Sequence, residues 1–358
     1  MRSDFFRRVQ LYYTMAYNYR YIFSFVISLI ILCTSCTPKY TIESYKAEGL
    51  RIKGTTFASM ISDKDGSLYL FTYRDCDEND LPVNSMIIFK SSNDGRNWEK
   101  VFEMEDIYLI DDQPCVAIDE NVYMKVRKYS DRTPEANWKK VSYVLSYNMK
   151  SNELKLSDSI PGLDADLKVY KGKLVCGTES GYLFLSKSLK FENTIANPQQ
   201  GGYMILVSDE EIWAYRYPNT MYSCFSGIEY KLPFSIDDVV LVNDSSALIS
   251  YREQNKEYAN LALLNLKSGS IIDDFRIDDF EFLEGMIKNE DSLIVACTTE
   301  YIGAFKKMAV NKDNGKTWEI LDIDGMVLGP YCLRDDTLFV MSREYFSSNP
   351  KIHKVALR

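Results

Sequence analysis

One unit recurs along this chain: an apolar strand-like run, a short polar turn, and a second apolar run. One copy places residues 115–118 before the turn 119–121 and residues 122–126 after it. Apolar runs of this length, rich in β-branched and aromatic residues and joined by a polar turn, predict a β-hairpin. Seven such turns follow one another, beginning at Asp63, Asp119, Lys171, Ser208, Asn243, Asn289 and Arg334.

The spacing of these hairpins predicts the architecture. The turns lie roughly 35 to 55 residues apart and about 45 on average, which leaves room for two further strands in each repeat. Four strands in a repeat of this length are typical of a propeller blade. We therefore predict an all-β protein, a seven-bladed β-propeller of four-stranded blades. A β-sandwich or an unclosed array of hairpins is the alternative architecture.

The last repeat is one strand short. Residues 327–358 hold three strand-like runs, of which residues 352–357 are the last. Residues 40–45 are expected to supply the fourth strand, because a ring joined in this way leaves no open edge between its first and last blades. Residues 37–358 are thus expected to form a single β-propeller domain, closed by N- and C-terminal strands, that exists as a monomer.

The first 36 residues are expected to be a signal peptide. The apolar run of residues 22–32 is too short to cross a bilayer and has the length of a signal-peptide core. Small residues then lead to Cys36, and this segment resembles a bacterial lipobox. The resemblance implies cleavage before Cys36, lipidation of its thiol and membrane anchoring at the outer membrane, on the periplasmic side or at the cell surface. Either Met1 or Met15 is the start, and an uncleaved anchor is the alternative.

Composition excludes several classes of function. The net charge of −9, with no basic stripe, argues against a nucleic-acid partner. His353 is the only histidine, which argues against Ser-His-Asp or Cys-His catalysis and against a histidine metal site. We predict no metal and no cofactor. Six cysteines follow Cys36, and their places in separate repeats favour buried thiols over disulfides: Cys76, Cys115, Cys176, Cys224, Cys297 and Cys332.

Two octapeptides, residues 91–98 and 311–318, spell nearly the same turn between apolar runs. In such a turn the third residue bonds its own backbone, the glycine takes a positive φ, and the tryptophan packs beneath. Both octapeptides resemble the Asp-box, or BNR repeat, of sialidase-like β-propellers, whose pattern is Ser-x-Asp-x-Gly-x-Thr-Trp. The structural residues that this resemblance implies are Asn93, Gly95, Trp98, Asp313, Gly315 and Trp318.

Two more stretches resemble sialidases. Residues 50–53 lie where sialidases carry an Arg-Ile-Pro motif, and residues 66–74 resemble the strand that follows it. Residues 329–333 resemble the segment that carries the nucleophilic tyrosine. The resemblance implies that Arg51 and Arg74 hold a substrate carboxylate, that Asp80 is the acid/base and that Tyr331 is the nucleophile. A six-bladed sialidase-type propeller is the matching alternative fold. On the other interpretation Tyr331 is a core aromatic residue and Arg51 a surface residue.

A charged residue ends the second strand of every hairpin. It is glutamate in two repeats and arginine in five, namely Arg74, Arg127, Arg216, Arg252 and Arg343. In a propeller this strand end lies on the face that surrounds the mouth of the central channel. Arginines there suit a carboxylate, sulfate or phosphate, which accepts bidentate charge-assisted hydrogen bonds. Alternatively, each arginine only ends its strand and pairs with an acidic neighbour.

These observations predict a lipid-anchored, extracytoplasmic binding propeller without catalytic activity. Its partner is expected to be an anionic glycan or a protein, bound by Arg51 and the five strand-end arginines. The first alternative is a divergent exo-sialidase-like glycoside hydrolase that uses Tyr331 and Asp80. The second is an assembly factor that binds proteins and has no affinity for glycans.

Overall fold

The computed structural model describes residues 40–50, 55–76, 82–109, 115–128, 141–161, 163–178, 181–196, 203–208, 210–216, 218–252, 260–277, 283, 285–289, 294–300, 304–313, 315–323, 327–343 and 350–357. The chain divides into two compact units, Met1–Thr41 with Leu357–Arg358, and Ile42–Ala356. Of the first unit, the described residues are Tyr40, Thr41 and Leu357, all of them in strands. Within the described ranges we find no helix suited to crossing a bilayer.

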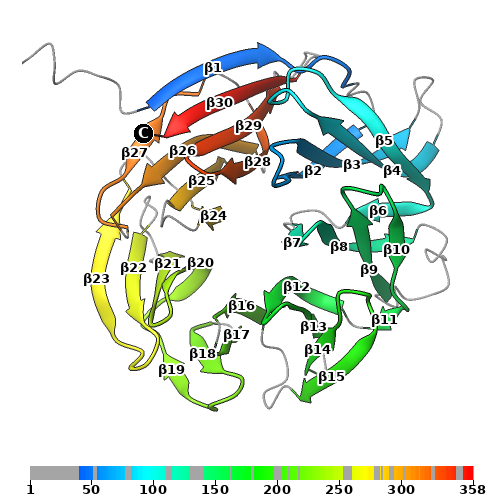
Figure 1. Ribbon diagram of the computed structural model, residues 1–358. Helices are drawn as coiled ribbons and strands as arrows, with labels where there is room; N and C mark the ends of the chain where they lie inside the picture. The colour runs from blue at the N-terminus through cyan, green and yellow to red at the C-terminus, as the bar shows by residue number, and fades with distance from the viewer. Residues whose placement is uncertain are drawn as a thin grey trace, which may run out of the picture. The chain divides into compact units, whose positions relative to one another are not determined.

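The second unit is a seven-bladed β-propeller, as the repeat spacing predicted (Figure 1). Blade 1 consists of β2 (Thr55–Ser62), β3 (Leu68–Cys76), β4 (Pro82–Ser91) and β5 (Glu99–Glu105). In blade 2, β6 (Ile107–Leu109) and β7 (Val116–Ile118) both pair with β8 (Asn121–Lys128), while β10 (Leu154–Leu156) and β11 (Ile160–Pro161) both pair with β9 (Val141–Asn148). Blade 3 consists of β12 (Leu163–Tyr170), β13 (Lys173–Thr178), β14 (Gly181–Leu185) and β15 (Phe191–Ala196).

The remaining blades repeat the same antiparallel order. Blade 4 consists of β16 (Tyr203–Val207), β17 (Ile212–Arg216), β18 (Thr220–Ser223) and β19 (Glu229–Lys231). Blade 5 consists of β20 (Ser235–Asn243), β21 (Ser246–Arg252), β22 (Asn260–Asn265) and β23 (Ile271–Arg276). Blade 6 consists of β24 (Gly285–Lys288), β25 (Ile294–Glu300), β26 (Ala304–Asn311) and β27 (Glu319–Leu321). Blade 7 follows as β28 (Val327–Arg334), β29 (Thr337–Arg343) and β30 (Lys351–Leu357), with β1 (Tyr40–Lys46) beside β30.

The only histidine of the chain fixes three strands of blade 7 to one another. His353, on β30, is completely buried. Its Nδ1 lies 2.8 Å from the Oγ of Ser44 on β1, and its Nε2 lies 2.5 Å from the Oγ of Ser342 on β29. A histidine held in this way has a structural role.

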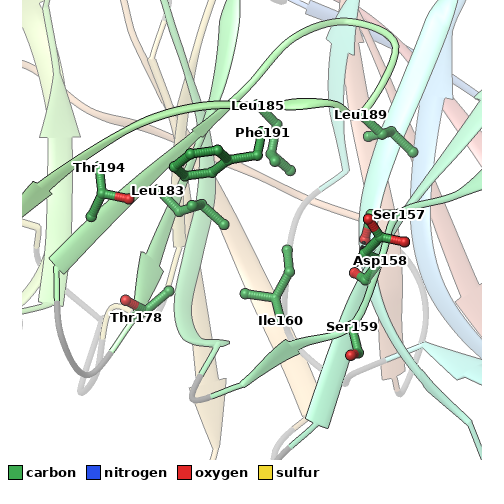
Figure 2. A pocket seen from close by; sticks show the side chains of 10 residues that line it. All are labelled: Ser157, Asp158, Ser159, Ile160, Thr178, Leu183, Leu185, Leu189, Phe191 and Thr194. Atoms are coloured by element: carbon green, nitrogen blue, oxygen red, sulfur yellow. Dashed lines mark hydrogen bonds between the residues drawn. The ribbon is translucent and has the colours of Figure 1, made fainter.

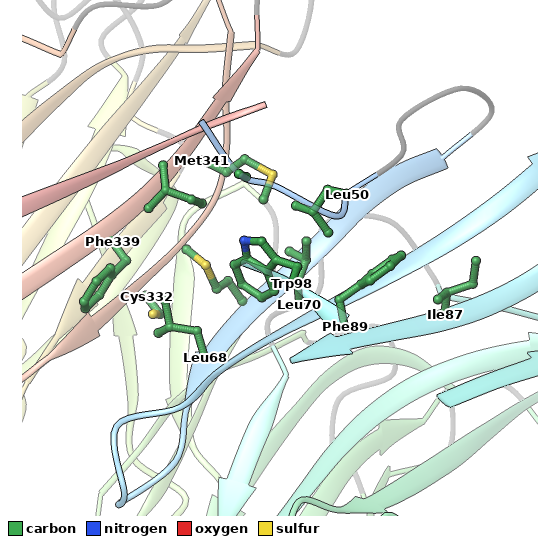
Figure 3. Packing of buried hydrophobic residues seen from close by; sticks show 12 residues of the cluster. Leu50, Leu68, Leu70, Ile87, Phe89, Trp98, Cys332, Phe339 and Met341 are labelled. Carbon is green, nitrogen blue, oxygen red and sulfur yellow. The ribbon is translucent and has the colours of Figure 1, made fainter. Parts of the chain in front are cut away.

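The core consists of layers between neighbouring blades, because successive side chains of a strand face opposite sides of its sheet. On β8, Val122 and Met124 pack toward blade 1, whereas Tyr123 packs toward blade 3. Each such side chain, once buried, contributes about 1.5–3 kcal/mol. Figure 3 shows the layer between blades 7 and 1, in which Trp98 lies among leucines of blade 1 and Met341 of blade 7.

Four cysteines are described, and all four are free thiols: Cys115, Cys176, Cys224 and Cys332. Burial raises the pKa of each of these thiols to about 12. Such thiols stay protonated at neutral pH and are poor nucleophiles. The prediction of free thiols is confirmed for all four, of which Cys176 and Cys332 are buried and Cys115 and Cys224 are half-buried. The side chains of the other two cysteines lie outside the described residues.

Candidate functional site

The two octapeptide turns share one hydrogen-bond scheme around a glycine. Gly95 and Gly315 have φ values of 85° and 97°, as a left-handed turn position requires. The N–H of Gly95 donates to the Oγ of Ser91 at 2.9 Å, and the N–H of Gly315 donates to the Oδ1 of Asn311 at 2.7 Å. The first side chain of each turn therefore replaces a backbone acceptor.

The third residue and the tryptophan complete each octapeptide turn. The Oδ1 of Asn93 accepts the N–H of Asn97 at 2.9 Å, and the Oδ1 of Asp313 accepts the N–H of Thr317 at 2.8 Å. The indole N–H of Trp98 donates to the carbonyl of Gly95, and that of Trp318 donates to the carbonyl of Gly315, both at 2.8 Å. Partial burial would raise the pKa of Asp313, but the hydrogen bonds from Thr317 and Asn311 outweigh it and lower that pKa.

Four more blades make a related turn between their third and fourth strands, which sequence reasoning missed. In each turn, one side-chain oxygen accepts one or two backbone N–H groups of the turn at 2.8 to 3.1 Å. The accepting residues are Asn148, Ser186, Ser223 and Asn265. A residue with positive φ follows three or four positions later, at Asn152, Leu189, Gly227 and Gly269. Ser or Asn followed four positions later by Gly or Asn is the sequence signal in three of these turns.

These turns receive side chains from the preceding blade. The hydroxyl of Tyr69 in blade 1 donates to the carbonyl of Met149 in blade 2 at 2.9 Å, and Tyr123 in blade 2 donates to Lys187 in blade 3 at 2.9 Å. A Cβ on Gly315 would lie only 2.8 Å from Cδ1 of Leu248 in blade 5. The turns therefore fasten neighbouring blades together.

The turn of blade 1 also carries an ionic contact with blade 7. Asp94 accepts hydrogen bonds from Nη2 of Arg334 at 2.9 Å and from Nζ of Lys354 at 2.7 Å. Burial would raise the pKa of Asp94, but these two cations outweigh that effect and lower it. The hydroxyl of Tyr45 donates to the Asp94 carbonyl, and burial raises the pKa of Tyr45 to about 12.

The predicted catalytic residues are described only in part. Tyr331 lies half-buried on β28, opposite Val340 of β29. Its hydroxyl reaches blade 6, where a Cβ on Gly285 would lie 3.0 Å from it. Tyr331 therefore lies between the first strands of two blades. Asp80 and Arg51 lie outside the described residues, as does the whole predicted signal peptide with Cys36.

Three strand-end arginines have described side chains, and two of them contact an outer strand of their own blade. Nε of Arg127 donates to Oγ of Ser142 on β9 at 3.3 Å. Nη2 of Arg216 lies 3.4 Å from Oε1 of Glu229 on β19. The pKa of Glu103 on β5 is lowered by its hydrogen bond from Lys100 and, among weaker causes, by the charge of Arg74. Arg252 and Arg343 end β21 and β29, but their side chains lie outside the described residues.

Acidic and metal-binding residues do not gather in the part of the chain that the structure describes. Among these residues, no three His, Cys, Asp or Glu side chains come together as metal ligands would. The acidic side chains described above instead accept hydrogen bonds from turns or pair with lysine and arginine.

A cavity of about 320 Å³ lies between blades 2 and 3, as Figure 2 shows. The sequence analysis did not predict it, and its only sequence signal is the polar break at residues 157–159. Leucines of blade 3 form much of its lining, and Phe191 lies at its rim with 64% of its surface exposed. The lining residues are Ser157, Asp158, Ser159, Ile160, Thr178, Leu183, Leu185, Leu189, Phe191 and Thr194.

Comparison with known proteins identifies the fold. No protein-family model and no curated protein matches this chain. The WD40 domain of Pan2 from Neurospora crassa is 8% identical with a TM-score of 0.52, covering 87% of this chain and 95% of that domain. The β-propeller domain of the Trilobed protease from Pyrococcus furiosus is 10% identical with a TM-score of 0.55, covering 82% of this chain and 93% of that domain. At these identities the similarity establishes a β-propeller and nothing finer.

Proposed function

We propose that this chain is a lipid-anchored, extracytoplasmic β-propeller that binds an anionic ligand without catalysing a reaction. The recurrence of arginine at one blade position carries the proposal. Arg74, Arg127, Arg216, Arg252 and Arg343 lie at or near the ends of β3, β8, β17, β21 and β29. Because the blades share one strand order, these five strand ends lie on one face of the propeller.

The described contacts of these arginines leave room for a ligand. Arg216 and Glu229 have side chains that are 38% and 36% exposed, and such a surface ion pair contributes only about 0–1 kcal/mol. Arg127 is bonded to Ser142 through Nε, which leaves the paired Nη groups as donors. A ligand carboxylate or sulfate would gain about 1.5–3 kcal/mol from each hydrogen bond with a charged partner. The weak pair with Glu229 therefore presents only a small barrier to a ligand anion at Arg216.

The test is binding of carboxylated and sulfated glycans and of acidic proteins as the salt concentration rises. We expect the affinity to fall with salt, because exposed charges are screened. Arg74→Ala and Arg252→Ala are expected to weaken binding by about 1–3 kcal/mol each, with little change in melting temperature. Arg96→Ala is the matched control, since Arg96 lies in the turn between β4 and β5, at the opposite strand ends. Loss of stability without any anion binding would show that these arginines are structural.

One observation favours the sialidase-like alternative. The two octapeptide turns have the hydrogen-bond scheme expected of Asp-boxes, and Tyr331 lies at the first strands of two blades. If the chain were a divergent exo-sialidase-like hydrolase, it would release a fluorophore from a sialoside, and Tyr331→Phe would abolish that release. On our proposal the unmodified protein releases none.

A further inference from the structure

We propose that the cavity between blades 2 and 3 binds a small amphiphile with an apolar body and a cationic amine head. This site is distinct from the arginine-bearing face, and it calls for the opposite ligand charge. Its volume of about 320 Å³ is at the small end of the range for small-molecule sites, about 300–1,000 Å³.

The cavity arises from a break in the outermost strand of blade 2. Residues 157–159 separate β10 from β11, although both strands pair with β9. The N–H of Ser157 donates to the carbonyl of Val144 at 2.9 Å, and the N–H of Val144 donates back to Oγ of Ser157 at 2.9 Å. The break is thus held to β9 in a defined position. At this break, no regular strand of blade 2 covers the neighbouring surface of blade 3.

Five of the ten lining residues are apolar, and four of these belong to blade 3. Ile160, Leu185 and Leu189 are buried at its base, while Leu183 is half-buried and the Phe191 ring lies at the rim (Figure 2). A sugar or another hydroxyl-rich body would bury polar groups against these leucines without partners, which is unfavourable. A hydrocarbon chain or ring instead removes apolar surface from water. The base of the cavity therefore selects an apolar body.

The mouth of the cavity selects the head group. Asp158 is the one charged residue among the ten described residues of the lining, and it lies beside Ser157 (Figure 2). An ammonium group donates hydrogen bonds to a carboxylate and to hydroxyl oxygens, and Ser159 supplies a hydroxyl on the same side of the cavity as Asp158 (Figure 2). A carboxylate head would be repelled by Asp158.

The test compares three probes with the same body: octylamine, octanol and octanoate. NMR titration measures the affinity of each probe. We expect octylamine to bind more tightly than octanol by only about three- to five-fold, because Asp158 is exposed and an exposed ion pair is weak. At the cavity, as read from the NMR shifts of its lining residues, octanoate should bind more weakly than octanol. Asp158→Asn should bring octylamine to the affinity of octanol, and Phe191→Ala should weaken octylamine and octanol together.

Phe225→Ala is the matched control, because Phe225 is an aromatic residue of blade 4, 44% exposed, that does not line the cavity. It should leave the affinities of all three probes for the cavity unchanged. Equal affinity of octylamine and octanol, or no binding of either, would overturn the proposal. So would a Phe225→Ala effect equal to that of Phe191→Ala. Melting temperatures would establish that each variant is folded.

Discussion

Single residues at the turns between third and fourth strands connect the backbone of one blade to side chains of its neighbour. Gly95 and Gly315 combine a positive φ with close contacts to Ile352 and Leu248. Asp94 adds a charge that two cations of blade 7 stabilise. Stability at the residue scale is therefore most sensitive where blades meet, and two predictions follow from these positions.

Alanine at Gly95 or Gly315 should destabilise the protein by more than alanine at Gly172. All three glycines have positive φ, so each variant carries backbone strain of about 1 kcal/mol. A new Cβ would lie 3.1 Å from Ile352 at Gly95 and 2.8 Å from Leu248 at Gly315, but it would meet nothing within 4 Å at Gly172. Chemical denaturation measures the difference. If Gly172→Ala costs as much as the other two, the contact between blades contributes nothing.

Asp94 should make stability depend on acidic pH. Its pKa is lower in the folded protein than in the unfolded chain, so its contribution is present above the unfolded pKa of about 3.9 and is lost as pH falls through the folded pKa. Asp94→Asn keeps the shape and removes the charge. The gap in unfolding free energy between wild type and Asp94→Asn should be largest near neutral pH and should shrink below about pH 4. A gap that stays constant down to pH 2 would contradict this account.

At the scale of strands and turns, tyrosine hydroxyls are the recurring link between blades. Tyr69 and Tyr123 lie on second strands, whereas Tyr230 lies on a fourth strand and donates to the carbonyl of Leu266 at 3.1 Å. Each of the three hydroxyls donates to the turn between the third and fourth strands of the blade that follows its own. Because the donors come from different strands, no fixed sequence spacing reveals them.

Tyr69→Phe and Tyr123→Phe should each cost about 0.5–1.5 kcal/mol, the usual net contribution of one hydrogen bond, or more because the accepting carbonyl is left without its donor. Tyr170→Phe is a suitable comparison, since its hydroxyl reaches Glu210 only at 3.5 Å and is exposed. Thermal unfolding, with the unfolding enthalpy measured by calorimetry, gives the change in unfolding free energy for each variant. Equal shifts for all three variants would argue against the role assigned to the turns.

The number of blades was predictable because it depends on local signals. Each hairpin has a polar turn between two apolar runs, and seven of them at propeller spacing leave few other folds. The two octapeptides also predicted their own turn geometry, since Gly95 and Gly315 have the positive φ expected of them. The related turns at Asn148 and Asn265 were missed because they lack the tryptophan.

The candidate sites were less predictable, because they depend on how blades meet. The cavity exists because the outermost strand of blade 2 is interrupted at residues 157–159. This interruption lies next to Leu183 and Phe191, which belong to blade 3. Nothing in either segment alone indicates the other. The direction of Arg216 toward Glu229 likewise follows from strand pairing within blade 4, not from the strand-end position that singled it out.

At the scale of the whole molecule, the membrane anchor remains a prediction from the sequence. Cys36→Ala should stop lipidation, so that the protein no longer incorporates labelled fatty acid and accumulates as the precursor. Cys33→Ala should leave lipidation intact, because only the cysteine after the cleavage position is modified. Mass spectrometry of the mature N-terminus decides the matter. A mature chain that begins elsewhere than Cys36 would show the lipobox assignment to be wrong.

The strand order of blade 7 has a consequence for biosynthesis. Residues 42–46 of β1 pair with β30, which is made only at the far end of the chain. During synthesis, β1 is therefore made before every other described strand and stays unpaired until β30 follows. Contacts this distant in sequence form slowly, and an unpaired strand is prone to aggregate. A chain that lacks β30 would leave β1 without its partner and the ring without the strand that joins its two ends.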